Sequence, residues 1–138
     1  MKLFIDTNVV LDLLQYREPW INDTIVLFQL AKEKKIELIV TDLTFVNVVY
    51  IAGKNFEKKK LHETLVGLKK LVSVIPIGDA CIEQALNGEF SDFEDATQYF
   101  AAKREHVDYI LTRDENGFKI SDIPVMNVTD FLNNFYFF

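Results

Sequence analysis

Short apolar runs alternate with longer helical stretches along this chain, and this alternation limits its fold more than any other feature. Strands that alternate with helices need crossover connections, which favours a parallel sheet with helices on both faces. At 138 residues, the chain is long enough to bury a core as one unit. We therefore predict a single α/β domain over residues 1–138. The expected strands cover residues 2–5, 37–40, 72–75, 109–111 and 123–126, and the expected helices cover 19–31, 43–51, 55–70, a stretch from 79 onward, 92–104 and a stretch from 129 onward.

Single residues predict several of these boundaries. Pro19 suits the first position of a helix, and Thr129 is expected to cap the last one. Ser91 and Glu94 have the spacing of a capping box at the start of the helix over residues 92–104. Pro124 lacks a backbone N–H, so the last strand is expected at the edge of the sheet.

Composition and charge narrow the class of protein. Hydrophobic residues make up 49% and charged residues 26%, as in ordinary globular proteins. No apolar run approaches the roughly 20 residues of a membrane span, and the first segment, MKLFIDTN, meets a charge too early for a signal peptide. A single cysteine, Cys81, excludes an internal disulfide and is interpreted as a buried thiol. We expect a cytoplasmic protein without a membrane partner.

Acidic residues stand at the ends of the predicted strands. Asp6 follows the first strand and Asp42 the second, while Asp114 lies three residues beyond the fourth. Asp92 and Asp95 open the helix that leads into that fourth strand, and side chains three apart on a helix share a face. Ligands of open α/β sheets bind beyond the carboxyl ends of the strands. We therefore expect several of these carboxylates to converge at one edge of the sheet.

Converging carboxylates favour a divalent cation and phosphodiester cleavage. Mg²⁺ prefers oxygen ligands and binds one or two carboxylates together with substrate phosphate. The net charge of −6 argues against a broad phosphate-binding surface, but a bound metal ion reverses the local sign. No Ser-His-Asp arrangement is evident, and His62 and His106 are each isolated among charged residues, so neither is expected to be catalytic. Metal-assisted hydrolysis fits this pattern.

Each acid also has a structural interpretation. Asp6 can cap a following helix, Asp92 and Glu94 suit the positive end of a helix, and Asp114 suits a turn. A further charged feature is a lysine cluster, interpreted either as a solvated helix face or as a contact surface for RNA or an acidic partner. Its members are Lys54, Lys58, Lys59, Lys60, Lys69 and Lys70.

Three motifs in the same order and spacing resemble the PIN-domain family. The segment Phe4-Ile5-Asp6-Thr7-Asn8, continuing to Asp12, is similar to the opening D-T-N motif of that family. Asp92-Phe93-Glu94-Asp95-Ala96, continuing to Ala101-Ala102, resembles its acidic helix. Tyr109-Ile110-Leu111-Thr112-Arg113-Asp114, with Phe118 following, resembles its strand that ends in T-x-D or T-x-N. The resemblance extends over essentially the whole chain.

The resemblance implies a three-layer α/β/α sandwich and a Mg²⁺- or Mn²⁺-dependent ribonuclease. It implies that Asp6, Asp95 and Asp114 are catalytic and bind the metal, with Asn8 and Thr112 as polar supports. Many small members are toxins that a cognate antitoxin neutralises, and many form homodimers. We therefore expect RNA as substrate, an antitoxin as partner and a homodimer.

One residue departs from the family pattern. The family usually has a glutamate on the helix after the second strand, whereas the matching residue here is Asn47, the lone polar side chain in Thr44-Phe45-Val46-Asn47-Val48-Val49-Tyr50. A buried amide needs a partner, which is expected to be a ligand water, a site carboxylate or nearby backbone. Asp42 or Asp92 is a candidate to compensate for the missing charge, with Asp92 as a further metal ligand.

Two other classes of protein share parts of this pattern. Haloacid-dehalogenase-like phosphatases also place an aspartate after the first strand, but their second aspartate corresponds to Asn8 here, and the chain is short for their cap and core. The second alternative is a catalytically weakened PIN-like scaffold that binds protein or RNA, and Asn47 is its main support. The apolar C-terminal segment, residues 131–138, is expected to fold back onto its own domain or onto a twin subunit.

Overall fold

The computed structural model describes residues 1–136 and contains one five-stranded parallel sheet in the order β3-β2-β1-β4-β5. The predicted parallel sheet is confirmed. The fifth strand is shorter than expected and lies at the sheet edge, directly after Pro124. The strands are β1 (Lys2–Ile5), β2 (Glu37–Thr41), β3 (Val72–Ile75), β4 (Tyr109–Leu111) and β5 (Val125–Met126).

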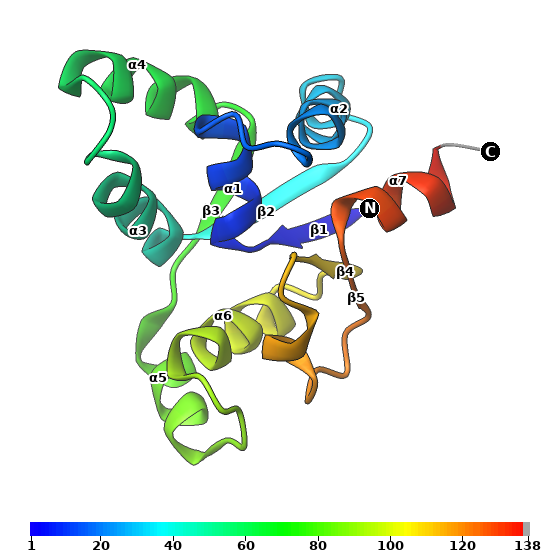
Figure 1. Cartoon of the computed structure of the whole chain (residues 1–138). Coiled ribbons are helices and arrows are strands. Elements are labelled where there is room, and N and C mark those ends of the chain that lie inside the picture. The colour runs from blue at the N-terminus through cyan, green and yellow to red at the C-terminus, as the bar shows by residue number, and fades with distance from the viewer. Residues whose placement is uncertain (137–138) are drawn as a thin grey trace.

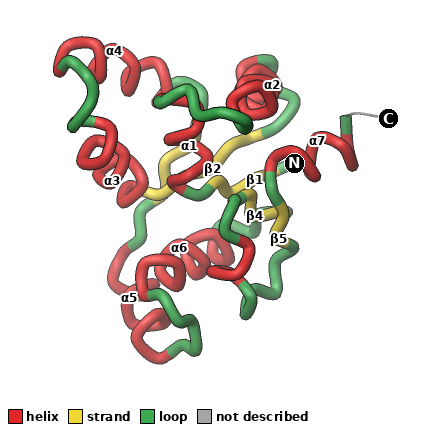
Figure 2. The backbone as a smooth tube through the Cα atoms, in the orientation of Figure 1, coloured by secondary structure: helices red, strands yellow, loops and turns green. Residues whose placement is uncertain are grey.

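Helices cover both faces of the sheet. In Figures 1 and 2, α5 and α6 lie on one side of the strands, and α1, α2 and α4 lie on the other. The helices are α1 (Thr7–Leu14), α2 (Ile21–Lys32), α3 (Asp42–Ala52), α4 (Lys58–Lys69), α5 (Gly78–Asn87), α6 (Phe93–Arg104) and α7 (Val128–Phe135), with a 3₁₀ helix, η1 (Glu115–Phe118), after β4.

The alternation of side chains along the strands divides the core in two. Leu3 and Ile5 of β1 pack into a cluster with apolar residues of α1, α2, α3, α4 and α7. Phe4, between them, points to the opposite face and joins a cluster with Cys81 of α5 and Tyr99 of α6. Successive strand side chains point to opposite faces, so each strand contributes to both cores. The three-layer α/β/α sandwich is therefore confirmed, and Cys81 is buried as expected.

The strand order creates a switch point between β1 and β4. The chain moves outward from β1 through β2 to β3 and then crosses to β4 on the other side of β1. Ile5 and Leu111, the last residues of β1 and β4, are paired, and the backbone N–H of Asp6 donates to the carbonyl of Leu111 at 3.0 Å. Ligands of such sheets bind at the crevice where the strand order reverses. This end of β1 and β4 is therefore where the site is expected.

Two helix starts differ from the sequence-based predictions because another side chain makes the cap. Asp92, rather than Ser91, caps α6, since its Oδ1 accepts from the backbone N–H of Asp95 at 2.9 Å. Asn127, rather than Thr129, caps α7 by accepting from the backbone N–H of Asp130 at 2.7 Å. The predicted capping box is therefore wrong, and Glu94 is free of that role.

Two features near the N-terminus also differ from the sequence-based prediction. Helix α1 was not predicted, since residues 7–14 are mostly apolar and two of them are β-branched valines without a clear helical period. Helix α2 begins at Ile21 instead of Pro19, and Pro19 lies in the turn before it. Both changes leave the layering as expected.

The C-terminal helix packs onto its own domain. Phe131 and Leu132 of α7 are fully buried in the core cluster that also holds Leu27 and Phe28 of α2. Phe135 and Tyr136 are partly buried against the same cluster. The expected fold-back is thus confirmed as far as residue 136, while residues 137–138 of the predicted segment lie outside the described part of the chain. Among residues 1–136, no helix has the length and apolar character to cross a bilayer.

Candidate active site

Asp6 lies at the switch point with both carboxylate oxygens hydrogen-bonded. Its Oδ1 accepts from the backbone N–H of Thr7 at 2.7 Å, which starts α1. Its Oδ2 accepts from the Thr112 hydroxyl at 2.9 Å and from the Asn8 amide at 3.4 Å. Burial raises the pKa of Asp6 and the charge of Asp114 adds to the rise, although the hydrogen bonds from Thr112 and Thr7 oppose it. Asp6 is therefore both a helix cap and a positioned acidic group.

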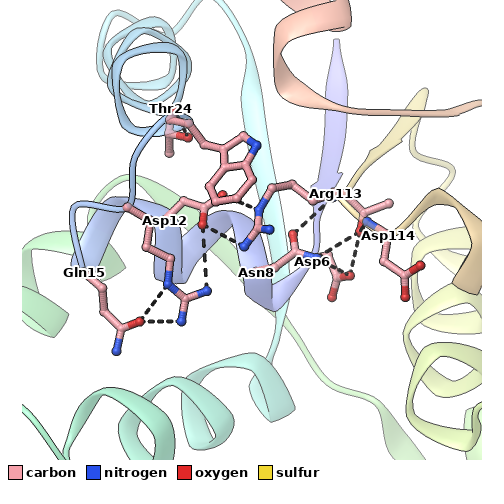
Figure 3. Close-up of polar contacts among 10 residues, drawn as sticks. Asp6, Asn8, Asp12, Gln15, Thr24, Arg113 and Asp114 are labelled. Carbon is pink, nitrogen blue, oxygen red and sulfur yellow. Dashed lines mark hydrogen bonds and ion pairs between the residues drawn. The ribbon is translucent and has the colours of Figure 1, made fainter.

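Thr112 links the acids of β1 and β4. Its hydroxyl donates to Asp6, accepts from the Asn8 amide at 3.2 Å, and accepts from the backbone N–H of Asp114 at 3.0 Å. Asn8 Oδ1 in turn accepts from the backbone N–H of Arg113 at 3.4 Å. Figure 3 shows Asp6, Asn8 and Asp114 grouped beside the end of β1. The two predicted polar supports, Asn8 and Thr112, lie within this group and hold its members in place.

Asp95 and Asp114 converge on one point beside Gly117. A Cβ atom added to Gly117 would lie 2.6 Å from Asp95 Oδ2 and 3.1 Å from Asp114 Oδ2. Asp114 Oδ1 also accepts from the backbone N–H of Gly117 at 3.3 Å, which caps η1. Helix α6 and the loop after β4 thus bring two carboxylates together, and the missing side chain at position 117 keeps the space between them open. Gly117 was not among the predicted site residues.

The electrostatics of Asp95 agree with the grouping of the acids at one edge of the sheet. Burial raises the pKa of Asp95 to about 7, and the charges of Asp6, Asp92, Asp114 and Glu94 contribute to the rise. Neighbouring negative charges disfavour ionisation of a carboxyl group. A titratable group shifted in this way by burial and several like charges is typical of a functional site.

Asp42 was a candidate to compensate for the missing acidic charge, but its contacts are with backbone N–H groups. Its Oδ1 accepts from the backbone N–H groups of Leu43 at 2.9 Å and of Ile77 at 3.2 Å. These bonds tie the start of α3 to the segment before α5. These contacts give Asp42 a structural role.

The side chain of Asn47 is hydrogen-bonded to a carboxylate. Its Nδ2 donates to Glu94 Oε1 at 2.9 Å, so helix α3 is joined to the first turn of α6. Of the partners considered for this amide, the structure shows a side-chain carboxylate. That carboxylate belongs to Glu94, which sequence reasoning assigned to a capping box.

A buried ion pair behind the acids was also missed by sequence reasoning. Asp12 of α1 is 1% exposed and accepts two hydrogen bonds from Arg113, from Nε at 2.9 Å and from Nη2 at 3.0 Å. The Arg113 guanidinium lies 3.8 Å from the centre of the Trp20 ring, and Arg17 approaches Asp12 at 3.9 Å. Figure 3 shows the Arg113 guanidinium beside Asp12. Arg113 stands between Thr112 and Asp114, so this pair anchors the site loop to α1.

The acidic residues fit a hydrated divalent cation. Within residues 1–136, no three acidic, histidine or cysteine side chains are close enough to enclose a metal ion. Mg²⁺ does not require such an enclosure, because it usually keeps several waters and binds through one or two carboxylates. Asp95 and Asp114, whose oxygens converge, would supply those carboxylates, with Asp6 beside them.

Comparison with known proteins identifies the family. A family model described as the PIN domain matches residues 2–116. This chain belongs to the PIN-domain family. The matched residues of this PIN domain include Asp6, Asp95 and Asp114 and end before α7.

One curated protein and one solved structure align with nearly the whole PIN domain. Ribonuclease VapC1 of Aquifex aeolicus (strain VF5) is 28% identical over 135 residues, which cover 94% of this chain and 92% of that protein. A crystal structure of VapBC2 from Rickettsia felis, bound to a DNA fragment from their promoter, contains a chain with a similar fold. The TM-score is 0.66 at 16% identity, and the match covers 92% of this chain and 98% of that chain. The similarity to the chain of the VapBC2 structure is a similarity of fold.

Proposed function

We propose that this PIN domain is an endoribonuclease that depends on Mg²⁺ or Mn²⁺, and that it is the toxin of a toxin–antitoxin pair. The observation that carries the proposal is the convergence of Asp95 and Asp114 on one open point beside Asp6, at the switch point of the sheet. Membership of the PIN family and the likeness to a ribonuclease support the reaction class. The likeness to a VapBC complex supports the partner class.

Some residues of the site would face the cation, and others hold these residues in position. Asp95 and Asp114 offer the converging oxygens, and Asp6 adds a third negative group next to them. Thr112 and Asn8 fix Asp6 relative to Asp114, while Asp92 caps α6 and adds negative charge close to Asp95. When bound, the cation supplies Lewis-acid stabilisation of the phosphate and an activated water.

The proposal extends to a cytoplasmic location, an antitoxin and a homodimer. Helix α3 exposes Val46, Val49 and Tyr50, which is apolar surface that a partner protein would cover. The lysine cluster is exposed along α4 and its flanks, so it remains available either to solvent or to an acidic partner. Light scattering on the purified chain tests the dimer, and a monomer at all concentrations would contradict it.

A cleavage assay tests the central proposal. Purified protein is expected to cut single-stranded RNA with Mg²⁺ or Mn²⁺, and EDTA or Asp6→Asn is expected to abolish the cleavage. Asn keeps the size of the side chain but removes the charge. Circular dichroism checks that the variant is folded. Unchanged cleavage in both EDTA and Asp6→Asn would contradict the mechanism. RNA binding without cleavage would favour the weakened scaffold instead.

A further inference from the structure

A pocket of about 290 Å³ lies beside the acidic site, between the turn before α2, the start of α7 and the loop after β4. Trp20 and Arg113 form one part of its lining, and Asp23 and Asp130 form another. Arg113 directly precedes Asp114 in the chain, so the pocket adjoins the acids through a single residue (Figure 3). The proposed cleavage step does not by itself explain this pocket.

The pocket offers a planar surface for stacking. The Arg113 guanidinium lies 3.8 Å from the centre of the Trp20 ring, and two hydrogen bonds to Asp12 hold it there. It covers one face of the indole, while 38% of Trp20 remains exposed. Unpaired RNA bases stack on aromatic rings and on guanidinium planes. The volume lies at the lower end of the usual range for ligand pockets, about 300–1,000 Å³, and therefore suits one base better than several.

The carboxylates of the pocket restrict the ligand that it can hold. One oxygen of Asp23 accepts from the Thr129 hydroxyl. One oxygen of Asp130 accepts from the Asn127 amide at 3.1 Å. Within residues 1–136, no group donates to the second oxygen of either carboxylate. These oxygens repel phosphate but can accept from the exocyclic amino group of adenine, cytosine or guanine, which uracil lacks.

A cationic side chain of a partner protein is the alternative ligand, because it would pair with the same carboxylates. The Arg113 guanidinium already takes the cation–π position on the Trp20 ring, so a second cation would gain from the carboxylates alone. A neutral base gains from both parts of the lining, since it stacks on the planar surface and donates to the carboxylates. The contacts therefore favour a base.

We propose that this pocket is a base-binding subsite, which receives an unpaired RNA base with an amino group from a nucleotide near the scissile phosphate. Trp20 and Arg113 provide the stacking surface, and Asp23 and Asp130 accept from the amino group. The subsite rests on the proposed ribonuclease function, because it takes RNA as its ligand. It adds a substrate requirement to that function, namely single-stranded RNA with adenine, cytosine or guanine near the point of cleavage.

The fluorescence of Trp20 tests the subsite without a label, since Trp20 is the one tryptophan of the chain. The full chain is titrated in EDTA, which prevents metal-dependent cleavage, with oligoadenylate, oligouridylate and a ribose-phosphate oligomer without bases. Oligoadenylate is expected to quench the fluorescence saturably and to bind severalfold more tightly than oligouridylate. The oligomer without bases is expected to leave the fluorescence unchanged, and equal quenching by it would overturn the subsite.

Substitutions measure the contribution of stacking, with the affinity for labelled oligoadenylate followed by fluorescence anisotropy. Trp20→Ala is expected to weaken binding about tenfold, which equals about 1.4 kcal/mol and lies within the range for a base stacked on an aromatic side chain. Trp20→Phe keeps an aromatic ring and is expected to retain most of the affinity. Tyr50→Ala is the matched control, because it removes a 70% exposed aromatic ring outside the pocket and is expected to leave the affinity unchanged. Circular dichroism checks that each variant is folded.

The carboxylates are tested by base preference rather than by affinity. Asn in place of Asp can donate as well as accept, so Asp23→Asn and Asp130→Asn are each expected to reduce the preference for oligoadenylate over oligouridylate. A purely structural role would lower thermal stability or weaken both RNAs equally. An unchanged ratio of the two affinities in both variants would overturn the role of these carboxylates in recognition.

The outcomes separate the subsite from the proposed function. If the chain cleaves RNA with Mg²⁺ but no RNA quenches Trp20 and Trp20→Ala binds RNA normally, the subsite fails and the function stands. If oligoadenylate quenches Trp20 but no RNA is cleaved, the ribonuclease function fails and the subsite stands on a PIN-like scaffold that binds RNA. Quenching by a lysine-rich peptide and by no RNA would assign the pocket to a cationic partner and overturn the proposal.

Discussion

Replacing Asp12 with alanine is expected to destabilise the fold through Arg113. The Asp12 side chain is 2% exposed and receives two hydrogen bonds from the Arg113 guanidinium, whose side chain is 26% exposed. Removing one partner of a buried ion pair costs about 3–5 kcal/mol, because the other charge is left without compensation. Arg113 keeps some contact with water and its stacking on Trp20, so we expect a loss at or below the lower end of that range, about 2–3 kcal/mol.

Arg17 provides a matched control for this prediction. It approaches the same carboxylate at 3.9 Å, and 34% of its side chain is exposed. Exposed ion pairs of this kind contribute about 0–1 kcal/mol. Arg17→Ala is therefore expected to have a small effect, whereas Arg113→Ala leaves the buried Asp12 charge without its bidentate partner and is expected to have a large one.

Urea unfolding of the metal-free protein, followed by circular dichroism at pH 7, measures the free energies of unfolding. For a chain of this size, a loss of 2–3 kcal/mol corresponds to a fall in Tm of roughly 10 °C. The reasoning is refuted if Asp12→Ala lies within about 0.5 kcal/mol of the unaltered chain, which is the usual range for surface substitutions. The reasoning is also refuted if Arg17→Ala and Arg113→Ala lower the free energy of unfolding by the same amount.

Two further outcomes concern the acidic site. The pKa of Asp95 rises from an ordinary 3.8 to about 7 on folding, so the folded protein holds a proton that the unfolded chain releases, and the stability of the metal-free protein should fall as pH rises from about 4 to 7. Asp95→Asn should reduce this fall in unfolding experiments at pH 5 and pH 8 with EDTA, and an unaltered pH slope would count against it. Gly117→Ala should weaken Mn²⁺ binding severalfold with little change in Tm, because the new Cβ would lie 2.6 Å from Asp95 Oδ2 and displace that carboxylate. Mn²⁺ affinity equal to that of the unaltered chain would mean that the site does not use this space.

The layers of the fold were predictable because they depend on local patterns. The alternation of Leu3, Phe4 and Ile5 assigns side chains to the two faces of the sheet before any partner is known. Helix α1 was missed because its residues are mostly buried and show no clear helical period, and the cap from Asp6 fixes its start. The cap of α6 was misassigned by one residue because Ser91 and Asp92 are both capable caps, and the choice depends on how the chain enters the helix.

The acids of the site were predictable for a topological reason, while their partners were not. A rule about the carboxyl ends of parallel strands places Asp6 and Asp114 together without knowledge of their contacts. The bond between Asn47 and Glu94 and the pair of Asp12 with Arg113 join residues far apart in sequence, and no periodicity indicates either. Gly117 was also missed, because a glycine three residues after an aspartate is typical of turns in general.

The ion pair between Asp12 and Arg113 also affects the charge of the acidic site. Arg113 is the neighbour of Asp114 in sequence, and a free guanidinium there would pair with the site carboxylates and compete with a cation. Asp12 and Trp20 hold that guanidinium against α1 and the turn before α2, so its charge is already compensated. Burial raises the pKa of Asp95, and the uncompensated charges of Asp6 and Asp114 add to the rise. The pair thus does more than anchor the loop: by compensating the positive charge next to Asp114 in sequence, it leaves the acids to the cation of the proposed function.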